Sequence, residues 1–163
     1  MTNQISKEYI LGTQDEELFR LGFQHRVWCK EAHELWRRAG FEYGQTILDL
    51  GCGPGFASVE LAQLVGPSGK IIAVDTSEKY LSYLETLKKV LWLDNIETRQ
   101  GDLHDLTLPS GSVDGAYARW VMCFVKDPSA VIERVAQSLR QGGVFAINDY
   151  FNVDYKLVPS SAA

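Results

Sequence analysis

Apolar and polar positions follow two kinds of pattern along this chain. Short apolar runs, typical of buried strands, occupy residues 46–50, 70–75, 96–100, 112–118 and 144–148. Between several of them, apolar residues recur every three or four positions, which predicts helices at 56–65, 77–92 and 128–140. A first helix is expected at 13–38, where Thr13 and Glu16 form a capping box. Gly142-Gly143 is expected to separate the last helix from the fifth strand.

This alternation of strands and helices predicts the fold class. Right-handed βαβ crossovers give a doubly wound α/β sheet, mainly parallel, with helices on both faces and the strand order 3-2-1-4-5. Residues 101–111 contain no convincing helix, but they are long enough to cross about three strands spaced about 4.8 Å apart. We expect one domain over residues 1–163, with a helical cap at 1–40, a core at 41–155 and a loose tail at 156–163.

Composition narrows the class of protein. The net charge of −5 argues against a protein that binds a nucleic-acid backbone. The apolar runs are too short to span a bilayer, and no signal peptide is evident at the N-terminus. Cys29, Cys52 and Cys123 are odd in number and widely spaced, which favours free thiols in a reducing compartment. We therefore expect a cytoplasmic protein with neither nucleic acid nor membrane as a partner.

Residues 47–55 are the most informative stretch. An apolar strand leads directly into Gly51, Gly53 and Gly55, and a helical pattern follows at once. Glycine permits backbone angles and close approaches that a Cβ atom would forbid. A strand, a glycine-rich turn and a helix N-terminus together allow a ligand to lie against the backbone.

Further chemistry-bearing residues fall at the carboxyl ends of the expected strands, where ligands bind in open α/β sheets. Asp75 ends the second strand, where a carboxylate can accept two hydrogen bonds from a ribose diol. Asp102 ends the third strand and could reach an adenine amino group, and Leu103 offers a backbone amide and an apolar face. Asp49 lies just before the turn and could receive an ammonium group. Arg119 and Trp120 follow directly after the fourth strand.

A dinucleotide is the alternative ligand for the glycine loop. The dinucleotide fingerprint G-x-G-x-x-G needs a third glycine where this chain has Phe56, and Asp49 suits a cationic amino-acid group better than a pyrophosphate. No G-x-x-x-x-G-K-[ST] phosphate loop occurs in the sequence. An NAD(P)-dependent oxidoreductase is therefore the less favoured enzyme class.

Four motifs in order resemble those of the class I S-adenosylmethionine-dependent methyltransferases, and the resemblance runs from about residue 9 to residue 155. They are Asp49-Leu-Gly-Cys-Gly-Pro-Gly55, Val74-Asp75, Gly101-Asp102 and Leu139-Arg-Gln-Gly-Gly-Val144. Two further stretches resemble a small-molecule methyltransferase branch with a helical N-terminal cap. These are Tyr9-Ile-Leu-Gly12, followed by Arg20-Leu21 and Gln24, and Arg119-Trp120-Val121.

The resemblance implies a Rossmann-like fold, S-adenosyl-L-methionine as the cofactor and a small molecule as the methyl acceptor. It implies that Gly51, Gly53 and Gly55 line the methionine portion of the cofactor. Arg119 would meet the methionine carboxylate or close the pocket.

The remaining implied cofactor contacts lie along the strand ends and on the first helix. Asp75 would hold the ribose hydroxyls with Thr76 beside it, and Asp102 and Leu103 would bracket the adenine. Tyr9, Arg20 and Gln24 would reach over the cofactor.

Structural roles compete with these site roles. Asp75 could cap the helix at Ser77, Asp102 could stabilise a turn, and Arg119 could form a surface ion pair. Tyr9, Arg20 and Gln24, taken singly, fit ordinary solvated or packing residues. The histidines lack metal-ligand spacing, so no metal is expected and a solvated or hydrogen-bonded role is favoured for His25, His33 and His104.

The end of the sequence raises a last set of expectations. The family pattern continues beyond the fifth strand, whereas this sequence stops at Ala163, so we expect a fragment of a longer chain, with a partner that covers the edge as the alternative. Residues 143–148 would form an exposed apolar edge open to self-association. Asp149 and Tyr150 are candidates for the acceptor side, and no catalytic base is identified. A cofactor-binding module without activity is the third hypothesis.

Overall fold

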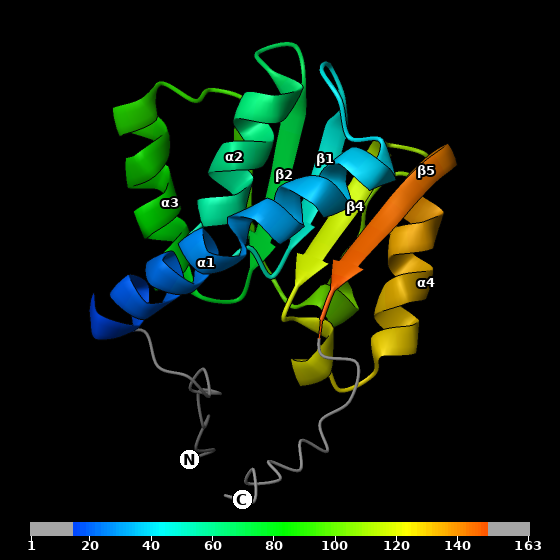
Figure 1. Ribbon diagram of the computed structural model, residues 1–163. Helices are drawn as coiled ribbons and strands as arrows, with labels where there is room; N and C mark the ends of the chain where they lie inside the picture. The colour runs from blue at the N-terminus through cyan, green and yellow to red at the C-terminus, as the bar shows by residue number, and fades with distance from the viewer. Residues whose placement is uncertain (1–14, 150–163) are drawn as a thin grey trace, which may run out of the picture.

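The computed structural model describes residues 15–149. They contain a five-stranded sheet in the order β3-β2-β1-β4-β5, in which every pair of neighbouring strands is parallel (Figure 1). The predicted fold class and strand order are confirmed. The elements are α1 (Asp15–Ala39), β1 (Thr46–Leu50), α2 (Phe56–Val65), β2 (Lys70–Asp75), α3 (Glu78–Leu91), β3 (Ile96–Gln100), η1 (Leu103–Asp105), β4 (Val113–Arg119), η2 (Met122–Phe124), α4 (Pro128–Ser138) and β5 (Leu139–Asn148).

Two apolar layers cover the sheet, one on each face. Ile71 and Ala73 pack with α1, α2 and α3, whereas Ile72 and Val74 pack with α4, η1 and η2. This division follows from the alternation of side chains along a strand. Figure 1 shows α1 crossing the sheet obliquely on the same side as α2, with α4 behind the sheet. The predicted helices on both faces are therefore present.

Helix α1 ends one residue later than predicted, and Gly40 terminates it. Gly40 has φ +73°, its N–H donates to the Arg37 carbonyl, and the N–H of Phe41 donates to the Trp36 carbonyl. This is the Schellman arrangement, which a left-handed glycine favours. The capping residue predicted for the start of the helix, Thr13, lies outside the described residues.

The boundary between α4 and β5 differs from the prediction. The helix ends at Ser138, and the strand begins at Leu139 instead of residue 144. Leu139 pairs with Val113, but the next pair is Val144 with Gly115, so residues 140–143 form an irregularity within the strand. Gly142-Gly143 therefore permits a bulge and does not break a helix, because glycine accepts the φ of +79° found at residue 142.

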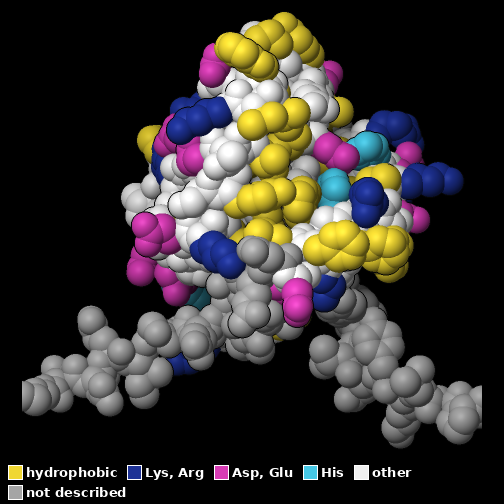
Figure 2. Space-filling model, turned by 90° about the vertical axis from the view of Figure 1, so that its left-hand side faces the viewer, with side chains coloured by type: hydrophobic (Ala, Val, Ile, Leu, Met, Phe, Trp, Pro, Cys, Tyr) yellow, Lys and Arg dark blue, Asp and Glu magenta, His cyan; other side chains and the backbone are white. Residues whose placement is uncertain are grey.

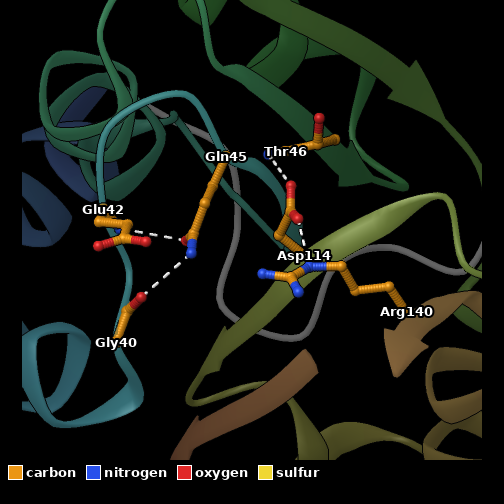
Figure 3. A network of polar contacts seen from close by, with 6 residues as sticks. All are labelled: Gly40, Glu42, Gln45, Thr46, Asp114 and Arg140. Atoms are coloured by element: carbon orange, nitrogen blue, oxygen red, sulfur yellow. Dashed lines mark hydrogen bonds and ion pairs between the residues drawn. The ribbon is translucent and has the colours of Figure 1, made fainter. Parts of the chain in front are cut away.

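Polar contacts connect the strands of the sheet at their amino-terminal ends (Figure 3). The Asp114 carboxylate accepts the Thr46 backbone N–H at 2.6 Å and the Arg140 Nε–H at 2.5 Å, which joins β4 to the starts of β1 and β5. Gln45 accepts the Glu42 backbone N–H at 3.1 Å in the connection from α1 to β1. The glycine-rich loop lies at the other, carboxyl-terminal ends of the strands.

The surface carries apolar side chains in two relevant places. Strand β5 is an edge strand of the described sheet, as predicted, and Val144 and Ile147 on it are 40% and 39% exposed. The face shown in Figure 2 carries a band of hydrophobic side chains with histidine, acidic and basic side chains beside it. None of the helices within residues 15–149 combines the length and apolar character needed to cross a bilayer.

Candidate functional site

The three loop glycines are required for different reasons. All three have positive φ angles, of 60° at Gly51, 54° at Gly53 and 84° at Gly55. A Cβ atom would collide with Val121 at Gly51 and with Leu84 at Gly55, whereas at Gly53 it would meet no described atom within 4 Å. Packing inside the protein therefore accounts for Gly51 and Gly55. Gly53 alone leaves bare backbone beside open space.

Asp75 anchors this loop from the end of β2. One carboxylate oxygen accepts the Gly53 N–H and the other accepts the Ser77 N–H, both at 2.8 Å. The side chain is buried, and burial raises its pKa while the backbone N–H groups oppose that rise. Asp75 therefore also contacts the start of α3, but the N-cap of that helix is Ser77, whose hydroxyl accepts the Tyr80 N–H. Each carboxylate oxygen has a second lone pair, so a ribose contact stays a prediction compatible with this geometry.

A pocket of about 250 Å³ lies between α1, the glycine loop and the end of β4. It brings together six of the predicted residues, which are Arg20, Gln24, Asp49, Gly51, Gly53 and Arg119. Sequence reasoning did not assign the aromatic part of its wall, which consists of Phe56, Tyr117, Trp120 and Phe124. The pocket therefore combines charged groups from β1, β4 and α1 with an aromatic wall.

The predicted adenosine contacts are not part of this pocket wall. Asp102 caps η1, because its Oδ1 accepts the His104 backbone N–H at 2.9 Å and lies 2.8 Å from His104 Nδ1. This is the turn-stabilising role considered from the sequence. Leu103 is buried and Thr76 is exposed. The ribose and adenine contacts of these residues stay predictions.

Asp49 places a buried carboxylate at the pocket. Its side chain is 2% exposed, and its Oδ2 accepts the Ser58 hydroxyl at 2.5 Å. Burial raises the pKa of Asp49 to about 6, while the Ser58 hydrogen bond and the charge of Arg119 oppose the rise. A cation bound beside this carboxylate would replace part of its lost hydration.

Arg119 has one satisfied and one unsatisfied end. Its Nη2 lies 2.7 Å from His25 Nδ1, and its guanidinium carbon lies 4.9 Å from the centre of the Trp120 ring. Its buried Nη1 has no hydrogen-bond partner among residues 15–149. Arg119 makes no ion pair within that range, so the described residues give no support to the surface ion pair considered as the alternative. A buried guanidinium donor without a partner fits an anionic ligand.

Trp120 holds a strained backbone conformation at the rim of the pocket. Its φ is +54°, which costs a bulky residue roughly 1–2 kcal/mol. Its N–H donates to the Asn148 carbonyl at 2.9 Å, and its ring meets the Trp28 ring edge-on with centroids 6.1 Å apart. The hydrogen bond links this residue to the end of β5. The only sequence signal was an aromatic residue directly after a strand end.

The remaining predicted residues fall into three groups. On α1, Gln24 Oε1 accepts a hydrogen bond from Arg20 Nη1 at 2.9 Å, so both residues of the cap reach the pocket together. Asp149 Oδ2 accepts the N–H groups of Val121 and Cys123 at 3.1 and 3.2 Å, which gives it a structural role at η2. Two candidates, Tyr9 and Tyr150, lie outside the described residues.

Comparison with known proteins adds a family to this geometry. The model of a family described as a methyltransferase domain matches residues 42–161. The demethylmenaquinone methyltransferase of Lactococcus lactis is 35% identical over 116 residues, which cover 68% of this chain and 46% of that protein. The trans-aconitate 2-methyltransferase of Azoarcus sp. is 32% identical over 126 residues, covering 77% of this chain and 47% of that protein.

Solved structures share the fold. A SAM-dependent methyltransferase from Aquifex aeolicus aligns with a TM-score of 0.76 at 23% identity and covers 93% of this chain and 82% of that chain. The chain spans about half the length, or less, of the curated relatives that it matches. The likeness to the Aquifex structure supports the architecture, and the family match supports the chemistry.

Proposed function

This chain belongs to the methyltransferase-domain family, and we propose that it binds S-adenosyl-L-methionine in the pocket beside Gly53 and transfers a methyl group to a small molecule. The match over residues 42–161 and the fold confirm the predicted class I family and its cofactor. The proposal for the site depends on one observation above all. Arg119 lines the same pocket as the Asp49 carboxylate, and its buried Nη1 has no hydrogen-bond partner among residues 15–149.

The methionine end of the cofactor is a zwitterion, and the pocket is lined by charged groups of both signs, Asp49 from β1 and Arg119 and Arg20 from β4 and α1. We place the carboxylate at Arg119 Nη1, because a charge-assisted hydrogen bond there satisfies a buried donor. We place the ammonium near Asp49, whose carboxylate is buried and has capacity for further hydrogen bonds. The open space beside Gly53 leaves room for the methionine carbon atoms that join the carboxylate and the ammonium group to the rest of the cofactor.

The adenosine end is proposed to follow the strand ends away from the pocket. Asp75 would accept the ribose hydroxyls beside Thr76, while keeping the Gly53 and Ser77 N–H groups on its other lone pairs. Asp102 and Leu103 would bracket the adenine at the end of β3. The parallel pairing of β1, β2 and β3 supports this path, because it aligns their carboxyl ends along one edge.

The protein's contribution to the reaction is orientation and exclusion of water. When bound, S-adenosyl-L-methionine supplies a sulfonium methyl group that is transferred in line to a nucleophile. Phe56, Trp120 and Phe124 in the pocket wall would exclude water from the reacting atoms, and α1 would hold the cofactor from above. The small-molecule class of acceptor is supported by relatives named for demethylmenaquinone and trans-aconitate.

Calorimetry with two ligands tests the proposal. The protein should bind S-adenosylhomocysteine with saturation and show no saturable binding of NADH at the same concentrations. Phe56 stands where the dinucleotide fingerprint needs glycine, and its ring packs on His25 at a centroid distance of 5.8 Å. Tighter binding of NADH than of S-adenosylhomocysteine would overturn the function in favour of an oxidoreductase.

We also propose that the protein self-associates through β5. The support is the edge position of the strand and the exposure of Val144 and Ile147 on it. Residues 144–148 contain neither lysine nor proline, the residues with which proteins commonly discourage edge pairing. A second copy of this chain would be the partner.

A further inference from the structure

Three elements meet through a line of polar contacts behind the pocket. Arg119 at the end of β4 contacts His25 of α1 at 2.7 Å, through Nη2 and Nδ1. His25 Nε2 in turn lies 3.2 Å from Glu60 Oε1 on α2. The second Glu60 oxygen, Oε2, lies 2.8 Å from Nε2 of His33, which follows His25 on α1. The imidazole of His25 thus connects the guanidinium of Arg119 to the carboxylate of Glu60.

Hydrogen-bond chemistry assigns the tautomer of that imidazole. A guanidinium only donates, so the Nδ1 atom that faces Arg119 must present its lone pair. The proton of a neutral His25 then lies on Nε2, where the Glu60 carboxylate accepts it. Burial and the charge of Arg119 both lower the pKa of His25, while Glu60 opposes them, which agrees with a neutral ring.

The ring itself has little freedom to move. His25 is 6% exposed and stacks on Phe56, the first residue of α2, at an interplanar angle of 30°. Gly22, one turn earlier on α1, lets the helix approach closely, because a Cβ there would lie 3.2 Å from the Phe56 ring. The acceptor offered to Arg119 is therefore fixed relative to the glycine loop and α2.

We propose that His25 is a positioning residue that holds the Arg119 guanidinium with its Nη1 atom directed at the methionine carboxylate. By occupying Nη2, the imidazole leaves Nη1 as the buried donor for the ligand. A guanidinium without this acceptor could turn about its side-chain torsions and lose that orientation. This inference rests on the proposed function, because the carboxylate belongs to the cofactor.

Two ligands separate positioning from general damage to the fold. S-adenosylhomocysteine carries the amino-acid end, whereas 5′-methylthioadenosine keeps the adenosine and the sulfur but lacks the carboxylate and the ammonium. His25→Phe keeps a ring for stacking on Phe56 and removes the acceptor. It should weaken binding of S-adenosylhomocysteine about tenfold, the loss expected for one hydrogen bond to a charged group, and leave 5′-methylthioadenosine binding within about twofold.

A conservative variant and a matched control complete the experiment. His25→Asn can place an amide oxygen near the position of Nδ1, so it should restore most of the preference for S-adenosylhomocysteine. His33→Phe, on the same helix and beside the same Glu60, should leave the preference unchanged because His33 does not contact Arg119.

The outcomes distinguish this inference from the function on which it rests. Equal weakening of both ligands in His25→Phe would overturn the positioning role, as would an unchanged preference for S-adenosylhomocysteine in that variant. A wild-type protein that binds neither ligand would instead overturn the proposed function.

Discussion

Asp75 at the end of β2 accepts the backbone N–H of Gly53 at 2.8 Å, so one strand fixes the loop that follows its neighbour. The same carboxylate accepts the N–H of Ser77 at the start of α3. Asp75, which is expected to bind the cofactor, thus also connects the glycine loop to the start of α3 through hydrogen bonds. Substitutions at Asp75 must therefore be assessed by binding and stability together.

Asp75→Ala should weaken S-adenosylhomocysteine binding by about 1.5–3 kcal/mol, the range for hydrogen bonds to a charged group. It should also lower the melting temperature, because two backbone N–H groups lose their acceptor. Calorimetry with adenosine and with 2′,3′-dideoxyadenosine separates the two effects. The variant should lose affinity for adenosine only; an equal loss for both nucleosides would assign Asp75 to the loop and not to the ribose.

Gly53→Val should abolish cofactor binding while the fold survives. The valine would occupy the open space beside the loop, and the φ of 54° adds a strain of roughly 1–2 kcal/mol. Gly142→Val is the matched control, because Gly142 also has a positive φ and open space around it but lies in the β5 bulge. We expect the two variants to be destabilised to a similar extent, and only the Gly53→Val protein to lose cofactor binding. A Gly53→Val structure with normally bound cofactor would contradict the close approach.

Asp49 should make stability fall as pH rises from about 4 to about 6. The pKa of Asp49 is raised by burial to about 6 in the folded protein, so in this window the folded state holds a proton that the unfolded chain has released. The resulting loss is about 3 kcal/mol at neutral pH for a shift of about two units. Asp49→Asn should reduce the pH dependence of the free energy of unfolding, measured by urea denaturation. The same slope in both proteins would contradict the raised pKa.

Cofactor binding should show the opposite dependence on pH at the same residue. An ammonium group favours the ionised form of Asp49, so wild-type affinity for S-adenosylhomocysteine should rise between about pH 5 and about pH 7. The Asp49→Asn protein should lack this rise, because its amide does not titrate. Calorimetry across that range checks the placement of the ammonium. A rise that persists in the variant would assign the titration to another group.

Ile147→Lys should reduce self-association if β5 is the interface. A lysine on an edge strand discourages pairing with a second copy through charge repulsion and its need for hydration. Leu64→Lys is the matched control, since Leu64 on α2 is equally exposed at 39% but lies away from that edge. Sedimentation velocity over a range of concentrations provides the measurement. A wild-type protein that stays monomeric at high concentration would refute the interface.

Much of the fold was accessible from the sequence because its signals are local. The bounds of β1, α2, β2 and β3 agree with the apolar runs and helical spacing, and the helix expected from residue 77 begins there, with Ser77 as its N-cap accepting the Tyr80 N–H. Each of these signals lies within a few residues of the element that it marks. The bulge in β5 was missed because Gly-Gly also ends helices, and only pairing with β4 distinguishes the two cases.

The sequence by itself determined the order of strands and helices, the glycine-rich loop, and the placement of Asp49, Asp75 and Arg119 at strand ends. The tertiary structure alone decided which of these groups share a pocket and which groups hold them in place. The contact between His25 and Arg119 joins residues 94 positions apart, and it depends on how α1 packs across the sheet. Periodicity encodes which face of a helix is buried, but only the packing of that face selects the partner that each buried polar atom meets.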